Sequence, residues 1–543
     1  MKLKEISTEQ KLKGAYYTPD ALAGAIVDLF CDGSYKEILE PSCGDGIFLD
    51  KLCENGLLAK AERVVAVELD DAPASTVKNR YSGHQNVTVL NEDFFDFYKR
   101  NDFSQYDLII GNPPYIRYQY LENDQRSLLS SILTSHNMKA NKLVNAWVGF
   151  MVACTDMLRD GGTLAFVIPA EILQVVYAED LRLYLATHFS SITLLAFEEL
   201  VFPEIEQEVL VFVGKKGADA GQIRVIESKD TEALSKRDIS AIPFQPIMRV
   251  HEKWTKYFIG AEDARALSAI KQDPRFVNFS DVALINVGIT TGNNKFFSLD
   301  DETSSKYELD EYTLPLIGRS SHASGIRFEE HDWKENRAAG KRSCLLVLEP
   351  NQYDTLTPIQ QSYIDAGEES GENTGYKCSI RESWYSVPSV WVPDAFFLRR
   401  NNLYPKFVLN ACSAVSTDTM HRIKFNDGFN HEIALLAYYN SVGFAFTELC
   451  GRSYGGGVLE ILPKEVGSMM LPDLFSLEFE EGAIEEHLRF IDDAIRSNSN
   501  IEIVLDRIDS AILVNELGLA PEMCQSCRRI WKTLQKRRLL RAE

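Results

Sequence analysis

The amino-acid sequence predicts an α/β protein whose N-terminal part is a doubly wound domain. Short apolar runs alternate with helical segments up to about residue 214, as in folds that cover a parallel sheet with helices. A turn that contains Gly44 and Gly46 follows the first apolar run and opens a helix. Glu68 ends the second run and Asp93 follows the third. Because the carboxyl ends of parallel strands meet at one edge of a sheet, these side chains are expected to share a site there.

The elements of this domain can be placed in chain order. A first helix is expected at residues 21–30, with Thr18 as its cap and Pro19 at its first position. Further helices are expected at residues 47–54 and 145–158, the second of them stopped by Gly161 and Gly162. Strands are expected at residues 37–40, 63–67, 87–90, 107–111, 163–168, 192–197 and 208–213.

The alternation of strands and helices is lost after residues 215–221, which are rich in glycine and alanine. The following stretch mixes short strands, turns and aromatic residues, and residues 363–377 are expected to form an exposed loop. From residue 478 the pattern is helical, and the end of the chain is basic from Arg528 onward. We therefore expect a catalytic domain at 1–240, an α+β domain at 241–475 and a helical C-terminal segment at 476–543.

Composition excludes several classes of protein. With 543 residues, 45% of them hydrophobic and 25% charged, the chain is expected to be globular and to hold two or three domains. Ten cysteines without a paired framework favour a reducing cytoplasm, and Cys524 and Cys527 lack the second ligand pair that zinc needs. For that reason no metal site is expected, and because no apolar run reaches 18 residues, no membrane span is expected. The formal charge of −22 argues against a generally basic nucleic-acid binder, although a local basic cleft would suffice.

The stretch Asn112-Pro113-Pro114-Tyr115 directly follows the apolar run at 107–111. Two prolines cannot continue a sheet, and they leave free carbonyl groups in a fixed bend. The Asn112 side-chain oxygen and the Pro113 carbonyl could each accept one hydrogen of an exocyclic amine, while Tyr115 stacks on the ring that carries it. The alternative is a common Asn-Pro-Pro turn without chemistry.

The order of the motifs resembles that of the gamma-class amino-methyltransferases, which modify adenine in bacterial restriction–modification systems. The resemblance is strong over residues 14 to about 214 and looser over residues 288–472. Five motifs within about a hundred residues carry it: Gly14-Ala15-Tyr16-Tyr17-Thr18-Pro19, Glu40-Pro41-Ser42-Cys43-Gly44-Asp45-Gly46, Glu68-Leu69, Asp93-Phe94 and Asn112-Pro113-Pro114-Tyr115.

This resemblance implies a Rossmann-like domain that binds S-adenosylmethionine as methyl donor, and an acidic loop suits that cationic ligand. Glu68 would hold the ribose hydroxyls and Leu69 one face of the donor's adenine, whose edge Asp93 and Phe94 would bind. The remaining positions implied for the donor are Tyr17, Thr18, Pro19, Glu40, Ser42, Gly44, Asp45 and Gly46. For Leu69 and Phe94 the alternative is plain core packing.

The resemblance also implies double-stranded DNA as substrate, with the target adenine turned out of the helix. Asn112, Pro113, Pro114 and Tyr115 would form the catalytic site, and Phe202 would pack on the other side of the base or lie in the core. The α+β domain would recognise the DNA sequence, and a separately encoded restriction endonuclease is a further implied partner. The polar, aromatic or basic candidates for DNA contact, each of which could equally be an ordinary surface residue, are Thr290, Thr291, Asn293, Lys295, Lys406, Arg452 and Tyr454. The basic residues from Arg528 would contact phosphates or form a solvated helix face.

Other functions share parts of this pattern. Protein-glutamine methyltransferases also use Asn-Pro-Pro-Tyr, but they are typically shorter and lack the Tyr-Thr-Pro opening and the large second domain. An RNA methyltransferase and a DNA-binding subunit without catalysis remain alternatives. Fusions with an endonuclease usually carry the nuclease ahead of the first motif, which only 13 residues precede here, so a methyltransferase without a nuclease is expected.

Overall fold

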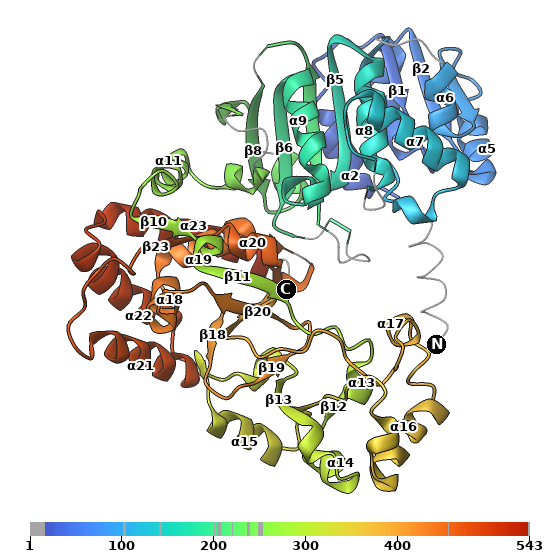
Figure 1. Cartoon of the computed structure of the whole chain (residues 1–543). Coiled ribbons are helices and arrows are strands. Elements are labelled where there is room, and N and C mark those ends of the chain that lie inside the picture. The colour runs from blue at the N-terminus through green and yellow to red at the C-terminus, as the bar shows by residue number, and fades with distance from the viewer. Residues whose placement is uncertain are drawn as a thin grey trace. The chain divides into compact units, whose positions relative to one another are not determined.

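A computed structural model describes most of the chain, and the protein divides into two compact units. The described residues are 17–100, 105–140, 144–199, 201–202, 208–219, 221–235, 239–247, 253–453 and 455–540. The first unit extends to Phe258, and the second comprises Ile259–Ser453 and Gly457–Leu539. Each unit has its own strands and helices (Figure 1).

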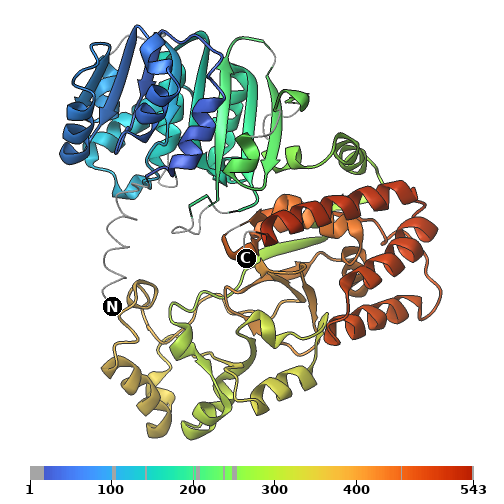
Figure 2. The same cartoon turned by 180° about the vertical axis from the view of Figure 1, so that it is seen from behind.

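The first unit is built on a nine-stranded sheet with the order β3-β2-β1-β4-β5-β7-β6-β8-β9. Strands β1 to β5 are parallel, whereas β7 runs antiparallel between β5 and β6. Helices α7, α8 and α9 lie on one face of the sheet and α2 on the other (Figures 1 and 2). The strands are β1 (Glu37–Glu40), β2 (Arg63–Glu68), β3 (Val87–Asn91), β4 (Tyr106–Gly111), β5 (Leu158–Pro169), β6 (Phe189–Phe197), β7 (Val209–Lys216), β8 (Gln222–Ser228) and β9 (Gln245–Pro246).

Helices connect these strands, as the alternating pattern predicts, and the α/β class of the domain is confirmed. β1 and α3 have the predicted bounds. The apolar run defines β1, and the glycine turn that follows it fixes the start of α3. The α-helices are α2 (Asp20–Asp28), α3 (Ile47–Glu54), α4 (Leu57–Lys60), α5 (Asp71–Arg80), α6 (Phe94–Arg100), α7 (Asn123–Ser135), α8 (Ala146–Met157), α9 (Glu179–His188) and α10 (Thr231–Ser235). The 3₁₀ turns are η1 (Tyr118–Tyr120), η2 (Ala170–Leu173), η3 (Val176–Ala178), η4 (Ile239–Ala241) and η5 (Trp254–Phe258).

Three expectations for this unit were wrong in detail. Pro19 is the N-cap of α2 and no side chain caps the helix, so Thr18 does not cap it. Gly161 and Gly162 do not end α8, which stops at Met157; they lie within β5, at an irregularity where its register with β4 shifts. Position 162 has no room for a side chain, because a Cβ there would lie only 2.9 Å from the Tyr106 carbonyl oxygen. The sheet also continues beyond residue 221 through β8 and β9.

The second unit is of the α+β kind, with four small sheets of orders β10-β23, β11-β20-β16-β18-β14, β12-β15-β13-β19 and β17-β22-β21. Its strands are β10 (Phe276–Asn278), β11 (Ala283–Val287), β12 (Ser298–Leu299), β13 (Thr313–Ile317), β14 (Arg327–Phe328), β15 (Cys344–Leu346), β16 (Ala395–Leu398), β17 (Arg400–Asn401), β18 (Phe407–Asn410), β19 (Val415–Ser416), β20 (Met420–Phe425), β21 (Arg452–Ser453), β22 (Leu459–Glu460) and β23 (Met470–Pro472).

The helices of the second unit surround these sheets (Figure 1). They are α11 (Ala261–Ile270), α12 (Phe279–Val282), α13 (Asn294–Phe297), α14 (Asp301–Lys306), α15 (Glu330–Ala338), α16 (Pro358–Glu369), α17 (Tyr376–Ser379), α18 (His431–Tyr438), α19 (Ser441–Cys450), α20 (Pro463–Gly467), α21 (Ala483–Arg496), α22 (Ile501–Ile508) and α23 (Pro521–Leu539). A π-helix follows α22 at Asp509–Glu516, and further 3₁₀ turns of this unit are η6 (Asp310–Tyr312), η7 (Ser320–His322) and η8 (Tyr353–Thr355). The turn η9 (Gly455–Gly457) follows β21 in the chain.

The observed division differs from the expected one at two places. The boundary lies after Phe258 rather than at residue 240, because Trp254 and Tyr257 are buried in the core of the first unit. The C-terminal helices are part of the second unit, where the Arg538 guanidinium pairs with Glu448 of α19 and both side chains are buried. Residues 363–377 are not a single exposed loop, since α16 and the start of α17 occupy most of them.

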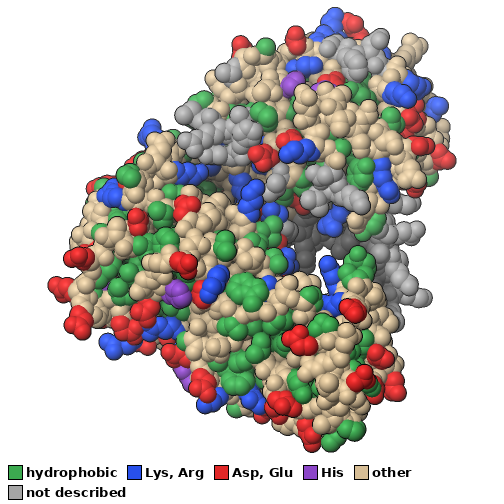
Figure 3. All heavy atoms as spheres, viewed as in Figure 1, with side chains coloured by type: hydrophobic (Ala, Val, Ile, Leu, Met, Phe, Trp, Pro, Cys, Tyr) green, Lys and Arg blue, Asp and Glu red, His purple; other side chains and the backbone are tan. Residues whose placement is uncertain are grey.

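Membrane and metal features can be stated for the part of the chain that the structure describes. There, no single helix has the length and apolar composition to cross a membrane. Only α18 and α19 taken together have that length and composition, and the chain bends by 76° between them. Both helices are mostly buried in the second unit. No group of three His, Cys, Asp or Glu side chains suited to a metal ion occurs among the described residues. On the face shown in Figure 3, acidic side chains gather over α14 and α16.

Candidate active site

A cavity of about 360 Å³ opens at the carboxyl ends of β1 to β4 in the first unit. Its volume lies within the range of roughly 300–1,000 Å³ that is typical of small-molecule sites. Five of its lining residues carry a carboxylate, which favours a cationic ligand. The lining residues are Tyr17, Pro41, Ser42, Gly44, Glu68, Leu69, Asp70, Glu92, Asp93, Phe94, Phe95, Asn112, Pro114, Ile116, Tyr120, Leu121, Glu122, Gln125, Ala146 and Phe150.

The glycine turn after β1 forms one wall of the cavity and orients Glu68. Gly44 and Gly46 adopt φ angles of 53° and 86°, which side-chain-bearing residues rarely adopt. The Gly44 N–H donates to Glu68 Oε2 at 2.8 Å, and the Asp70 N–H donates to Glu68 Oε1 at 2.8 Å. Two backbone donors therefore fix the carboxylate at the end of β2, and each oxygen keeps room for a second hydrogen bond.

Asp93, which follows the neighbouring strand β3, is held in a comparable way. Its Oδ1 accepts the Phe95 N–H at 2.7 Å, and its Oδ2 accepts from Nε2 of Gln125 at 2.6 Å. The Oε1 of Gln125 in turn accepts the Glu122 N–H at 3.2 Å, at the first turn of α7. Gln125 therefore connects the start of α7 to the carboxylate of Asp93.

The segment that contributes Gln125 was missed by sequence reasoning. Tyr120, Leu121, Glu122 and Gln125 all line the cavity. Their only sequence signal is that they follow the Asn-Pro-Pro-Tyr motif within about ten residues, and no spacing rule predicts a contact between α7 and Asp93.

Glu40 lies at the end of β1 and is 1% exposed. Burial raises the pKa of its carboxyl group well above the usual 4.5, and repulsion by Asp45, Glu68 and Asp50 acts in the same direction. Among the described residues, nothing forms a hydrogen bond to its Oε2. A buried acceptor beside an acidic cavity fits a cationic ligand, since a positive group nearby would stabilise the ionised carboxylate.

The Asn-Pro-Pro-Tyr stretch begins where β4 ends at Gly111, as predicted. Asn112 and Pro114 line the cavity, and Ser42 Oγ donates to the Asn112 carbonyl oxygen at 3.2 Å, which connects this stretch to the glycine turn. Tyr115 is 7% exposed, its hydroxyl donates to the Val167 carbonyl at 3.2 Å, and burial raises its pKa. Phe202 is 6% exposed in the same core, so neither ring belongs to the cavity lining in this state.

The structure brings together seven of the twelve residues predicted to hold the donor: Tyr17, Ser42, Gly44, Glu68, Leu69, Asp93 and Phe94 all line the cavity. Leu69 is 55% exposed, whereas Phe94 is buried and stacks on Phe150 with 4.4 Å between ring centroids. Burial raises the pKa of Tyr17, and the negative charges of Asp45, Glu68 and Asp70 raise it further. The other five, Thr18, Pro19, Glu40, Asp45 and Gly46, lie outside the lining.

The candidates for DNA contact in the second unit fall into two groups. Thr290, Thr291 and Asn293 lie in the loop before α13, in which Thr290 is exposed, and Lys295 lies in α13 itself. Thr291 is buried and donates to Asn294 at 2.5 Å, Asn293 caps α13, and Lys295 forms an ion pair with Glu372. This loop is therefore largely a structural support.

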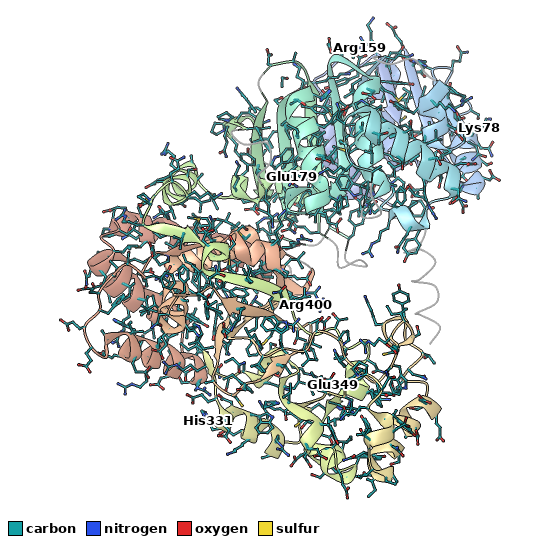
Figure 4. All side chains as sticks on the ribbon, in the orientation of Figure 1. Lys78, Arg159, Glu179, His331, Glu349 and Arg400 are labelled. Atoms are coloured by element: carbon teal, nitrogen blue, oxygen red, sulfur yellow. The ribbon has the colours of Figure 1, made fainter. Side chains whose placement is uncertain are left out.

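Two further candidates are committed to contacts inside the second unit. Lys406 donates to the carbonyl groups of Ala323 and Ser324 at 2.7 and 2.9 Å, and burial lowers its pKa to about 8. Arg452 pairs with Glu465 at 2.9 Å, and both side chains are mostly buried. Their predicted role as DNA contacts is therefore not supported, and Tyr454 lies outside the described residues. By contrast, Arg400, labelled in Figure 4, has a 70% exposed side chain that sequence reasoning did not single out.

The basic residues near the C-terminus are also paired within the second unit. Arg528 contacts Asp506 and Asp509, and Arg529 contacts Asp263 of α11. Since carboxylates already neutralise much of this segment, the prediction that it contacts phosphates is not supported by the geometry. Arg541 lies outside the described residues.

A cavity at the carboxyl ends of the strands is the usual ligand position in an α/β fold, and comparisons with known proteins specify the class and the family. Residues 51–202 match the family model described as Eco57I restriction-modification methylase, and residues 251–513 match that of the type II methyltransferase M.Eco57I, C-terminal domain. The chain belongs to the type II restriction–modification methyltransferases.

Individual relatives agree with this assignment. The type II methyltransferase M.AccI of Acinetobacter calcoaceticus is 25% identical over 538 residues, covering 94% of this chain and 95% of the relative. The type II methyltransferase M.HindII of Haemophilus influenzae is 27% identical and covers 54% of this chain and 57% of its own length. Among solved structures, the type IIL restriction–modification enzyme MmeI in complex with DNA has a similar fold, with a TM-score of 0.52, 12% identity and coverage of 95% of this chain and 75% of MmeI.

Proposed function

We propose that the chain is a site-specific DNA methyltransferase that transfers a methyl group from S-adenosylmethionine to the 6-amino nitrogen of adenine in double-stranded DNA. One observation carries the proposal: Asn112 and Pro114 line the same cavity as Glu68 and Asp93. Residues suited to a target amine and residues suited to an adenosine-type donor therefore meet at one edge of the sheet. Proximity of this kind can supply much of the rate of a two-substrate reaction.

The acidic cavity suits the donor. S-adenosylmethionine supplies a methyl group on a positively charged sulfur. Glu68, oriented by the N–H groups of Gly44 and Asp70, would accept hydrogen bonds from the ribose hydroxyls. Asp93 would accept a hydrogen bond from the amino group of the donor's adenine. The exposed side chain of Leu69 would cover one face of that ring. The backbone of the glycine turn and Tyr17 would hold the methionine portion.

The target amine would be held by the Asn112 side-chain oxygen and the Pro113 carbonyl. Two acceptors aimed at one nitrogen stabilise the positive charge that develops when it attacks a methyl group. The adenine must first leave the base stack, which costs a few kcal/mol. Tyr115 and Phe202 would stack on its two faces. Stacking of a base on an aromatic side chain contributes roughly 1–3 kcal/mol, which would offset this cost.

The second unit would provide contacts to DNA on both sides of the target base. Its sequence matches the C-terminal domain of a type II methyltransferase, and relatives of restriction–modification systems cover both units. A separate restriction endonuclease that cuts the same DNA sequence would be the natural partner of such an enzyme.

Sequencing of methylated bases in DNA from a methylation-free host tests this proposal. Cells that express the wild-type chain should carry N6-methyladenine at one DNA word. Asn112→Ala should lower the methylation rate by about 10²–10³-fold, as for loss of one electrostatic contact to the transition state. Asn79→Ala, at an exposed position of α5, serves as the matched control. Absence of any methylated word, or full activity of Asn112→Ala, would refute the proposal.

A further inference from the structure

The short helix α17 presents two strongly exposed apolar side chains on the second unit. Tyr376 is 74% exposed and Ile380, which follows the helix, is 60% exposed. Residues four apart on a helical turn lie on the same side, so the two side chains form one small apolar surface. Exposed apolar surface of this kind costs solubility and commonly marks a binding site.

Contacts with the loop that precedes α13 hold this surface in place. Gly292 has a φ of +83°, and a Cβ there would lie 2.8 Å from Lys377 Cβ, so the loop backbone touches α17. Cys378 is fully buried beneath the helix. The Arg381 guanidinium donates to the Thr290 carbonyl at 3.1 Å and fixes the other end. A precisely placed contact surface requires such support.

The surroundings of α17 are basic, in contrast to the chain as a whole. Residues 290–295 and 371–381 contain three basic side chains and one acidic side chain, whereas the whole chain has a formal charge of −22. The Lys377 ammonium lies 5.9 Å from the centre of the Tyr376 ring. Lys295 is already paired with Glu372, which leaves Lys377 and Arg381 as the basic side chains beside the apolar surface. A local positive charge beside exposed apolar groups matches a polyanion that also offers apolar edges.

We infer that α17 is a DNA-contacting tip whose Tyr376 and Ile380 side chains touch base edges in a groove, with Lys377 at a flanking phosphate. Apolar side chains read thymine methyl groups or wedge between base steps, and basic side chains bind phosphates without regard to sequence. This inference rests on the proposed function. It also reassigns the loop at 290–295, which supports the tip instead of forming it.

Fluorescence anisotropy with the full-length protein tests the inference. The probes are a labelled duplex that carries the methylated word and a duplex of the same composition with the word scrambled. The variants are Tyr376→Ala, Tyr376→Phe, Ile380→Ala and Lys377→Gln. Ile503→Ala on α22, where the side chain is 53% exposed, is the matched control for loss of an exposed apolar group. Thermal melting of each variant checks that the second unit is folded.

Tyr376→Ala should weaken binding to the word-containing duplex by roughly 5- to 150-fold, the range for loss of one good base contact, with an unchanged salt dependence. Tyr376→Phe should bind nearly as the wild type does. Lys377→Gln should instead weaken both duplexes alike and flatten the slope of log affinity against log salt by about one.

Wild-type affinity in a folded Tyr376→Ala protein, equal to that of Ile503→Ala, would overturn the inference. So would a variant that changes self-association but not DNA affinity, because α17 would then contact a second copy of the chain. If the wild type methylates no DNA, the proposed function is wrong. If the wild type methylates DNA but the α17 variants bind DNA normally, only the inference about α17 is wrong.

Discussion

The two units use their charged side chains in different ways. In the first unit, Glu68 and Asp93 are fixed by backbone N–H groups at strand ends and still face a cavity. In the second unit, Lys406, Arg452 and Arg528 contact carbonyl or carboxylate groups of their own unit. Glu68 and Asp93 at the ends of parallel strands therefore stay available for a ligand, whereas these three basic residues of the second unit are engaged in contacts within their own unit.

The largest effect expected from this contrast concerns Arg538 of α23. Its guanidinium pairs with Glu448 at 2.9 Å, and both side chains are fully buried. Arg538→Ala should lower the free energy of unfolding by about 3–5 kcal/mol, because it leaves an uncompensated buried carboxylate. Arg529→Ala on the same helix removes a pair with Asp263 in which the arginine side chain is 48% exposed, and should cost only about 1 kcal/mol. Equal losses in chemical denaturation would show that the C-terminal helix is not anchored in this way.

In the first unit, Gln125 should affect the ligand more than the fold. Gln125→Glu places a second carboxylate against Asp93 and should weaken S-adenosylmethionine binding by roughly tenfold or more, since a hydrogen bond to a charged group contributes about 1.5–3 kcal/mol. Two carboxylates that share a site bind a proton readily, so the loss should shrink as the pH falls from 8 to 5.5. Calorimetric titration checks both statements. Gln119→Glu, on an exposed turn, is the control, and an effect that does not depend on pH would argue against the contact with Asp93.

Glu40 should destabilise the ligand-free protein at neutral pH. Its pKa is raised in the folded state above 4.5, so the folded protein binds more protons and stability falls as pH rises from 4.5 toward the folded pKa. Glu40→Gln removes this dependence and should melt at a higher temperature than the wild type above pH 5. The gap should grow by at most about 1.4 kcal/mol per pH unit. Glu54→Gln, at an exposed position, should show no such trend. The same change of melting temperature with pH in both variants would contradict the assignment of the effect to the buried Glu40 carboxyl group.

The smallest effect is expected for Tyr115→Phe. This change removes the hydrogen bond to Val167 and should cost about 1 kcal/mol of stability. Methylation should be largely retained, because stacking needs the ring. Tyr115→Ala should bind DNA and methylate poorly. If Tyr115→Phe is as inactive as Tyr115→Ala in a methylation assay, the hydroxyl group takes part in the reaction and the stacking role is wrong.

Sequence patterns predicted the first unit well because its signals are local. A buried strand followed by Gly44 and Gly46 leaves little choice of structure, and β1 and α3 follow the predicted bounds. The exception at β5 is instructive, since Gly161 and Gly162 look like a turn but lie inside the strand. The partner of Gln125 could not be predicted, because Asp93 is 32 residues away and only the packing of α7 brings them together.

The second unit was predictable in class but not in detail. Its short strands pair with partners far along the chain; β11 for example pairs with β20, more than a hundred residues later. Such pairing decides whether Lys406 faces solvent or the Ala323 carbonyl, and no local pattern encodes it. Composition also misjudged residues 363–377, where a polar sequence still forms most of α16 and the beginning of α17.

The central claim is that the first unit has separate groups for the donor and for the target amine, placed at one cavity. Calorimetric titration of S-adenosylmethionine into Asn112→Ala and Glu68→Ala proteins tests it most directly. Asn112→Ala should bind the donor with an affinity within about threefold of the wild type although methylation is about 10²–10³-fold slower. Glu68→Ala should lose roughly tenfold or more in donor affinity, because two ribose hydrogen bonds to a charged group are removed. A large loss of donor affinity in Asn112→Ala, or normal affinity in Glu68→Ala, would contradict this account.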